Sequence, residues 1–315
     1  MYWMGIDLGG TNIVAGLVDE TRTIVDRVSV KTRVPRPMEE MADDMADMVR
    51  ALLARNGLNM GDLPFVGVGV PCTANEETGH MEDANNLGFD DVAFVPLLEE
   101  RLGLPVRIGN DANAAAWGEF VAGDYPEGSM LMVTLGTGIG GGIILNRKLW
   151  SGYNFAAGEF GHMTLCMDGV PCTCGRRGCF EAYASATALI RMTRAAMEKH
   201  PESAMHSIAA ENGGVDGRTA FLAQQQGDAA GSAVVGEYVH YLSIGVANIV
   251  NIFFPEVVAV SGGVSNQGEN LLAPLRQAVS QQEYGAAYTT RHPRILRCIL
   301  GNDAGVIGAA LFAEE

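Results

Sequence analysis

Apolar runs that stop at glycine-rich turns mark the first part of the chain. Residues 3–8 form one such run, which breaks at residues 9–12, and a second run follows over residues 13–18. Two runs joined by a pair of glycines predict a β-hairpin. Residues 65–70 are non-polar at every position up to Pro71, a pattern typical of a central strand buried on both faces. The N-terminal part is therefore expected to contain a sheet.

A helical periodicity follows over residues 38–53. Its apolar face consists of Met38, Met41, Met45, Met48, Val49, Leu52 and Leu53. Acidic residues largely occupy the opposite face, as in an amphipathic surface helix. We expect the methionines to pack in the core rather than to form an adaptable binding face.

Strands and helices alternate along the rest of the chain. Further strands are expected at residues 28–32, 106–108, 130–135, 142–145 and 257–260. Helices are expected at residues 97–102, 113–121, 180–199 and 232–253, and a capped final helix at 306–312. This order indicates an α/β protein. The strand, glycine turn and strand over residues 130–145 repeat the pattern of the N-terminal hairpin. A chain of 315 residues is also longer than one ordinary hydrophobic core requires. We therefore expect two lobes of related construction.

Composition and charge exclude several classes of protein. Hydrophobic residues make up 48% of the chain, which is too much for a disordered protein. The net charge of −16 argues against non-specific binding to nucleic acid or to an anionic membrane. No signal peptide and no uninterrupted apolar stretch of about 18 residues is visible, so we expect a cytoplasmic protein with reduced cysteines.

The glycines at residues 136–141 satisfy the pattern G-x-G-x-x-G, but a dinucleotide site is not the preferred interpretation. That fingerprint requires a helix directly after the glycines, which would direct its N-terminus at a pyrophosphate. Residues 142–145 instead have the pattern of another strand.

Two glycine turns together favour phosphate binding, although each alone could be an ordinary hairpin turn. Backbone N–H groups without neighbouring side chains can surround phosphate oxygens, and threonine hydroxyls can add further donors. The candidate phosphate-binding residues are Asp7, Gly9, Gly10, Thr11, Asn12, Gly136, Thr137 and Gly138. Of these, Asp7 ends a strand, where its carboxylate could hold Mg²⁺ through water.

A block of cysteines predicts a structural metal site. Cys172, Cys174 and Cys179 are closely spaced, and His162 lies ten residues upstream of the first. Three thiolates and an imidazole form a closed tetrahedral Zn²⁺ site without an open position for catalysis. On spacing alone, Cys166 is an equal alternative to His162, and a redox-active thiol pair is another interpretation.

The chain resembles the ROK family (repressors, open reading frames, kinases) of the actin, Hsp70 and hexokinase ATPase superfamily, and its sugar kinases in particular. Besides the first glycine turn, the motifs that carry the resemblance are 69–71, 110–113, 159–162, 172–181 and 261–264. They cover nearly the whole chain. The resemblance implies a two-lobed actin-like, ribonuclease H-like fold with a cleft between the lobes. We expect a small lobe at residues 1–110 plus 302–315 and a large lobe, with the zinc loop, at residues 111–301.

The resemblance also implies roles for individual residues. Asp111, which by its place before a predicted helix could equally be an N-cap, becomes the general base for the 6-hydroxyl of a sugar. The implied sugar ligands are Asn86, Asn110, Asp111, Glu159, His162 and Glu181. The implied zinc ligands are His162, Cys172, Cys174 and Cys179. Gly262 and Gly263 are implied to lie against the adenosine of ATP.

These roles imply an ATP- and Mg²⁺-dependent hexokinase with structural Zn²⁺, most simply a glucokinase. The resemblance to the family, rather than any residue role, implies a homodimer. The alternatives are a kinase for N-acetylmannosamine, N-acetylglucosamine, fructose or allose, and a ROK sugar sensor without catalysis. Two departures from the family pattern leave the sugar preference open: Cys72 stands where glycine is usual, and Gly109 where an acidic residue is common.

Overall fold

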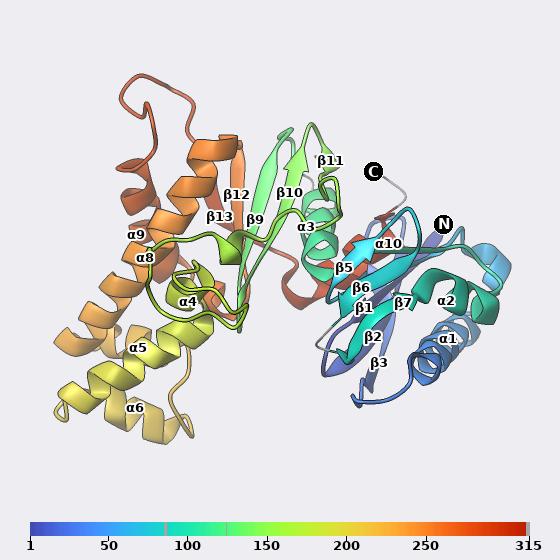
Figure 1. Cartoon of the computed structure of the whole chain (residues 1–315), viewed down its shortest axis with the longest axis horizontal. Helices are drawn as coiled ribbons and strands as arrows, with labels where there is room; N and C mark the ends of the chain where they lie inside the picture. The colour runs from blue at the N-terminus through green and yellow to red at the C-terminus, as the bar shows by residue number, and fades with distance from the viewer. Residues whose placement is uncertain (85–86, 124, 313–315) are drawn as a thin grey trace. The chain divides into compact units, whose positions relative to one another are not determined.

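The computed structural model describes residues 1–84, 87–123 and 125–312 (Figure 1). The chain divides into two compact units, each of which is described by itself. Unit 1 comprises Met1–Ser129, Gly142–Gly158 and the described residues from Ile299 onward. Unit 2 comprises Met130–Gly141 and Glu159–Cys298.

Unit 1 is built on a five-stranded mixed sheet in the order β3-β2-β1-β4-β8. Its strands are β1 (Tyr2–Leu8), β2 (Asn12–Asp19), β3 (Ile24–Lys31), β4 (Val66–Val70) and β8 (Val106–Asn110). The hairpin of β1 and β2 is antiparallel, whereas β1, β4 and β8 run parallel. The expected N-terminal hairpin and the buried strand after residue 65 are confirmed.

The two faces of this sheet carry different residue types because side chains alternate along a strand. On one face, Met4, Ile6 and Leu8 belong to the same buried core as the methionines of α1 (Met38–Arg55). On the other face, glycines of three neighbouring strands stand in register, with Gly5 opposite both Gly16 and Gly67. A Cβ on Gly5 or Gly67 would overlap the backbone of α10 (Ala304–Ala310), so these glycines allow that helix to approach the sheet closely.

Further elements of unit 1 surround this sheet. They are α2 (Phe94–Leu102), α3 (Asp111–Ala122), β11 (Lys148–Leu149), the short helices Met60–Asp62 and Gly301–Asp303, and a separate sheet of β5 (Thr73–Asn75), β6 (His80–Ala84) and β7 (Phe89–Ala93). Helix α3 packs closely on α10 (Figure 1). Helix α3 and residues Gly142–Gly158 therefore belong to unit 1, although we expected them in the large lobe. The limits of the two functional lobes stay a prediction.

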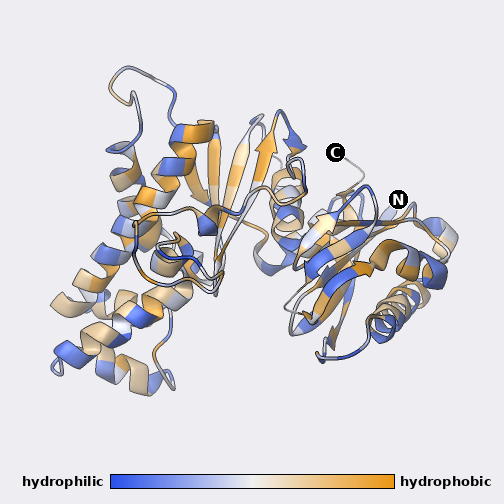
Figure 2. Ribbon diagram, viewed as in Figure 1, coloured by the Kyte–Doolittle hydropathy of each residue, from blue (hydrophilic) through white to orange (hydrophobic). Residues whose placement is uncertain are grey.

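Unit 2 combines parallel strands with a group of helices. Its strands β9 (Met130–Leu135), β12 (Val257–Ser261) and β13 (Arg294–Arg297) are parallel neighbours in the sheet order β11-β10-β9-β12-β13. Strand β10 (Ile139–Leu145) begins in unit 2 and continues into unit 1. The helices are α4 (Glu181–Ala184), α5 (Ala186–Lys199), α6 (Met205–Glu211), α7 (Thr219–Gln225), α8 (Ala229–Phe253) and α9 (Glu269–Ser280), with short helices at Phe160–His162 and Gly263–Gln267. In Figure 2 the strands of this sheet are mainly in the hydrophobic colour, whereas α1 of unit 1 shows both hydrophobic and hydrophilic colours.

Helix α8 is long and apolar enough to cross a membrane by length and composition, although polar residues such as Glu237 interrupt its apolar stretch. Of its most apolar window, 61% is buried within the protein. Such burial is the usual state of a core helix in a globular protein.

Two expectations about helices need correction. The helix expected over residues 180–199 is interrupted at Ser185, whose side chain accepts the N–H of Ala188 and begins the separate helix α5. The last helix begins at Ala304 without a side-chain cap, because Asp303 pairs with Arg27 instead.

Candidate active site and metal centre

Three parallel strands of unit 1 end at the same edge of the sheet and bring candidate residues together. Asp7 near the end of β1 stands opposite Gly69 of β4, and Val70 at the end of β4 stands opposite Asn110 of β8. The carboxyl ends of parallel strands are the usual position of ligand sites in α/β sheets. Burial raises the pKa of Asp7 at this edge. The first glycine turn and the pair Asn110–Asp111 therefore belong to one edge.

Asn110, rather than Asp111, is the N-cap of α3. The Asn110 side-chain oxygen accepts the N–H of Ala112 at 2.9 Å and that of Asn113 at 3.2 Å. The Asp111 carboxylate accepts the same Ala112 N–H at 2.7 Å from the first helical position, and Asp111 is half-buried. The N-cap interpretation of Asp111 is therefore wrong. A carboxylate in the first turn also interacts favourably with the helix dipole.

Cys72 lies beside this pair. Its carbonyl accepts the side-chain amide of Asn110 at 3.2 Å, and the residue is buried. Burial, together with the nearby carboxylates of Asp111, Asp83 and Glu82, raises the pKa of the Cys72 thiol to about 12. The thiol is therefore protonated, and not nucleophilic, at neutral pH.

The first glycine turn is held from a neighbouring strand. The Gly9 N–H donates to the Asn12 carbonyl at 3.0 Å and closes the turn. Thr32, which follows β3, donates its hydroxyl to the Gly9 carbonyl at 2.6 Å and its N–H to the Thr11 carbonyl at 3.0 Å. Thr32 is fully buried. Thr32 was not predicted as a functional residue, although the strand register, with Lys31 opposite Asn12, places it next to the turn.

The second glycine turn is held in a similar way by the start of α5. The Gly136 N–H donates to the Gly138 carbonyl at 3.0 Å, and the Gly136 carbonyl accepts the N–H of Ala186 at 2.9 Å. The Thr187 hydroxyl donates to the Thr137 carbonyl at 2.7 Å. Thr187 was also missed, because no local pattern connects residues 50 positions apart.

Gly262 and Gly263 lie next to the second turn. They follow β12, which runs parallel to β9 with Ser261 opposite Thr134. Gly262 has a φ of 84°, and a Cβ there would overlap the backbone of Leu135, directly before the turn. Only glycine combines this backbone conformation with this approach.

Strand β10 follows the second turn directly. The rejection of a dinucleotide fingerprint is therefore confirmed, since no helix begins there.

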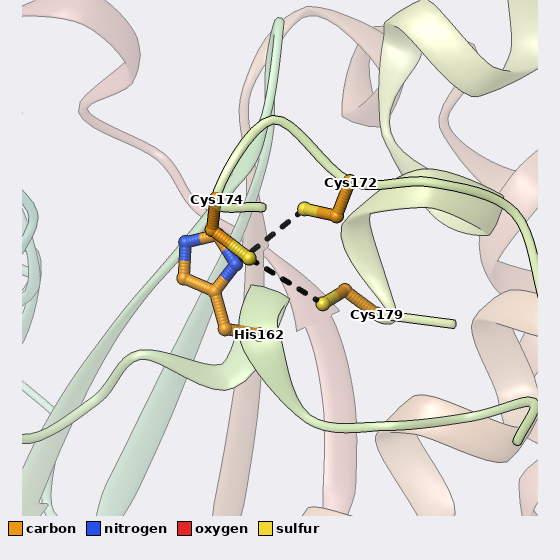
Figure 3. Close-up of side chains that lie close together, drawn as sticks. All are labelled: His162, Cys172, Cys174 and Cys179. Carbon is orange, nitrogen blue, oxygen red and sulfur yellow. Dashed lines mark hydrogen bonds between the residues drawn. The ribbon is translucent and has the colours of Figure 1, made fainter. Parts of the chain in front are cut away.

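The four predicted metal ligands converge in unit 2 (Figure 3). One ligand atom each of His162, Cys172, Cys174 and Cys179 lies within 4.8 Å of all the others. The Sγ atoms of Cys174 and Cys179 are 3.7 Å apart, and His162 Nδ1 lies 3.8 Å from Cys172 Sγ. Cys166 is not a member of this cluster. Three sulfurs and one imidazole nitrogen in this space fit the donor set of structural Zn²⁺.

The ring of His162 and two carboxylates connect the cluster with its surroundings. His162 Nε2, on the other side of the ring from the sulfurs, lies 3.9 Å from a Glu159 oxygen. Glu181 directs one oxygen to the N–H of Ile139 at 2.9 Å, and the other lies 3.8 Å from Cys172 Sγ. Glu159 is exposed and Glu181 half-buried.

The predicted residues therefore gather in two groups, one in each unit. Unit 1 holds Asp7, Gly9, Gly10, Thr11, Asn12, Asn110 and Asp111, and unit 2 holds Gly136, Thr137, Gly138, Glu159, His162, Glu181, Gly262, Gly263 and the cysteines. Asn86 lies outside the described residues.

Comparison with known proteins places the whole chain in one family. The ROK family model matches residues 3–315. A glucokinase of Halalkalibacterium halodurans is 35% identical over 317 residues, covering all of this chain and 95% of its own. An N-acetyl-D-glucosamine kinase of Salmonella paratyphi B is 30% identical and covers 98% of each chain. The crystal structure of a Streptomyces griseus ROK family glucokinase in complex with glucose and AMPPNP matches with a TM-score of 0.81 and 34% identity, covering 98% of each chain. The resemblance seen in the sequence and the α/β fold expected from it are thus confirmed, and the chain belongs to the ROK family.

Proposed function

We propose that this protein is an ATP-dependent glucokinase, which transfers the γ-phosphoryl group of ATP to the 6-hydroxyl of glucose. The observation that carries the proposal is the position of Asp111 at the sheet edge that also holds Asp7 and the first glycine turn. The full-length similarity to a glucokinase of Halalkalibacterium halodurans, and to a Streptomyces griseus enzyme solved with glucose and AMPPNP, supports this choice.

In this proposal Asp111 takes the proton of the sugar hydroxyl as the new P–O bond forms. A carboxylate in that position also orients the hydroxyl, and phosphoryl transfer depends mainly on positioning and on stabilisation of charge. The N-cap bonds of Asn110 fix the start of α3 and thereby the backbone of Asp111. We also predict that Asn110 binds a hydroxyl of the sugar.

The glycine turns bind the phosphates through their backbone N–H groups, and Gly262 with Gly263 contacts the adenosine. Asp7 would hold Mg²⁺ through water, because a carboxylate is a hard oxygen donor of the kind that Mg²⁺ prefers. When bound, the cation neutralises phosphate charge.

The carboxylates of Glu159 and Glu181 and the Nε2 atom of His162 bind ring hydroxyls of the sugar. Both carboxylates can accept hydroxyl donors, and His162 can donate from Nε2 when its Nδ1 is a zinc ligand. His162, Cys172, Cys174 and Cys179 would hold the zinc, which with four protein ligands would brace the loop without taking part in the reaction. Asn86 completes the predicted set of sugar ligands.

Two other functions remain as outcomes of the test. The Salmonella N-acetyl-D-glucosamine kinase favours an N-acetylhexosamine as the second candidate substrate. A ROK sugar sensor would bind sugar without turnover. A cytoplasmic location and a homodimer stay predictions.

A coupled assay of ADP release decides among these functions. The purified chain is assayed with ATP and Mg²⁺ against glucose, N-acetylglucosamine, N-acetylmannosamine, mannose, fructose and allose. We expect the highest kcat/KM with glucose. The variant Asp111→Asn is expected to lose about 10²- to 10⁴-fold in kcat while it still binds glucose in a calorimetric titration. Turnover by Asp111→Asn close to that of the wild type would remove the general base from the proposal.

A further inference from the structure

Both glycine turns are held by a threonine hydroxyl from a different part of the chain. In unit 1, Thr32 donates to the Gly9 carbonyl at 2.6 Å across 23 positions of sequence. In unit 2, Thr187 donates to the Thr137 carbonyl at 2.7 Å across 50 positions. The two turns thus share the same type of contact, although the threonine comes from the end of a strand in one unit and from a helix in the other.

Each contact fixes the direction of a particular backbone N–H group. A trans peptide is planar, and its C=O and N–H point in opposite directions. The carbonyl of Gly9 shares its peptide plane with the N–H of Gly10. Because Thr32 holds this carbonyl, the N–H of Gly10 points away from Thr32. In the same way, Thr187 fixes the direction of the N–H of Gly138.

Backbone hydrogen bonds reinforce both arrangements. The N–H of Thr32 holds the Thr11 carbonyl at 3.0 Å, which directs the N–H of Asn12 away from β3. The N–H of Ala186 holds the Gly136 carbonyl at 2.9 Å, which directs the N–H of Thr137 away from α5. In the first turn, the N–H groups of Gly10 and Asn12 therefore point away from Thr32. In the second turn, those of Thr137 and Gly138 point away from the start of α5. Converging N–H groups of this kind bind anions.

We propose that Thr32 and Thr187 are positioning residues for phosphoryl transfer, because their hydroxyls direct the N–H groups of the two glycine turns toward the phosphates of ATP. The inference rests on the proposed function, since it takes ATP as the ligand of these turns. Neither threonine needs to touch the nucleotide. Preorganised donors cost no reorientation when the phosphates bind, so loss of either hydroxyl weakens ATP binding.

The test removes each hydroxyl without changing the size of the side chain. Thr32→Val and Thr187→Val are compared with Thr32→Ser and Thr187→Ser, which keep the donor. The matched control is Thr193→Val, because Thr193 is also fully buried and donates its hydroxyl to a carbonyl, that of Leu189 at 2.8 Å, but contacts neither turn. The measurements are KM for ATP, KM for glucose, kcat, and the Kd of the ATP analogue AMPPNP by titration calorimetry.

We expect each Val variant to raise KM for ATP and the Kd of AMPPNP by about three- to tenfold, the effect of one lost hydrogen bond. KM for glucose should stay unchanged, the Ser variants should bind AMPPNP within about twofold of the wild type, and Thr193→Val should do the same. Thr32 is fully buried, so Thr32→Val can give little folded protein. Thr187 is exposed, so Thr187→Val still tests whether the threonine hydroxyl supports ATP binding.

Unchanged AMPPNP binding by folded Val variants, or equal losses for the Val and Ser variants, would overturn the inference. A wild-type chain that binds AMPPNP but phosphorylates none of the sugars would contradict the proposed function alone, since the calorimetric comparison still reports on the threonines. A wild-type chain that does not bind AMPPNP would overturn both.

Discussion

The carboxylate of Glu181 accepts the backbone N–H of Ile139 at 2.9 Å, directly after the second glycine turn. Its other oxygen lies 3.8 Å from the Sγ of Cys172, a member of the metal cluster. One side chain therefore connects the candidate zinc loop with a candidate phosphate turn within unit 2. A sugar hydroxyl bound to Glu181 would share the carboxylate with this backbone contact.

Substitutions of Glu181 separate these two roles. Glu181→Ala should raise KM for both glucose and ATP by about tenfold or more, because it removes the sugar ligand and the acceptor for Ile139. Glu181→Gln should mainly raise KM for glucose, since an amide oxygen still accepts the Ile139 N–H. Initial-rate kinetics with either substrate varied measure both effects.

Glu159→Gln is the matched control for Glu181, because the Glu159 carboxylate lies beside His162 Nε2, whereas that of Glu181 accepts the backbone N–H of Ile139 after the turn. It should raise KM for glucose alone. An increase in KM for ATP in Glu181→Gln as large as that in Glu181→Ala would show that the charge, rather than the accepted hydrogen bond, holds the turn.

The sequence was most informative where composition and periodicity agree. Strand β4 was predicted because every position from Phe65 to Val70 is non-polar, and the structure buries the whole strand on both faces. The sheet of β5, β6 and β7 was not predicted. Strand β6 buries only Met81 and Ala84, and acidic residues interrupt the alternation that marks a half-buried strand.

Long-range contacts could not be derived from local patterns. Asparagine and aspartate are both good N-caps, so their order in Asn110–Asp111 did not decide which one caps α3. Spacing to Cys172 alone did not decide between His162 and Cys166; the family resemblance favoured His162, and the structure places His162 rather than Cys166 in the cluster. Thr32 and Thr187 act on turns 23 and 50 positions away, and no short motif reports such a distance.

Zinc content tests the metal centre. Protein purified without chelator should contain about one zinc per chain by elemental analysis, and Cys179→Ser should lose most of it, since removal of one ligand opens the tetrahedral site. Cys166→Ser is the control, because Cys166 lies outside the cluster, and it should keep the zinc. Less than half a zinc per chain in the wild type, or equal losses in both variants, would contradict the assignment.

The buried thiol of Cys72 predicts a loss of stability at high pH. Folding raises its pKa from about 9 to about 12. Between these values the unfolded chain has released a proton that the folded chain retains, so the free energy of unfolding falls as pH rises. Below about pH 8 both states are protonated and the effect vanishes.

Comparison with Cys72→Ala isolates this contribution. The variant loses packing at every pH, so the informative quantity is the difference in unfolding free energy between wild type and variant. We expect this difference to shrink by about 1–2 kcal/mol from pH 8 to pH 10.5, measured by urea unfolding. A difference that does not change with pH would show that the thiol is not the group that titrates.

Glu119 of α3 is expected to be a main determinant of the stability of unit 1. It is fully buried, and its carboxylate accepts the N–H of Ile299 at 2.7 Å, the N–H of Leu300 at 3.0 Å and the hydroxyl of Tyr125 at 2.9 Å. Glu119→Ala would leave three donors without this acceptor and should lower the free energy of unfolding by about 2–4 kcal/mol. Tyr125→Phe removes one donor and should cost about 1 kcal/mol.

Tryptophan fluorescence during urea unfolding measures this effect in the correct unit. The three tryptophans of the chain, Trp3, Trp117 and Trp150, all belong to unit 1, so their transition reports on that unit. A Glu119→Ala variant no less stable than Tyr125→Phe would mean that the amides of Ile299 and Leu300 find other acceptors or water. In that case the chain segment at Ile299 would not depend on the carboxylate, and α3 would be held to the C-terminal segment by its packing on α10 and by the hydrogen bond from Trp117 Nε1 to the Leu311 carbonyl.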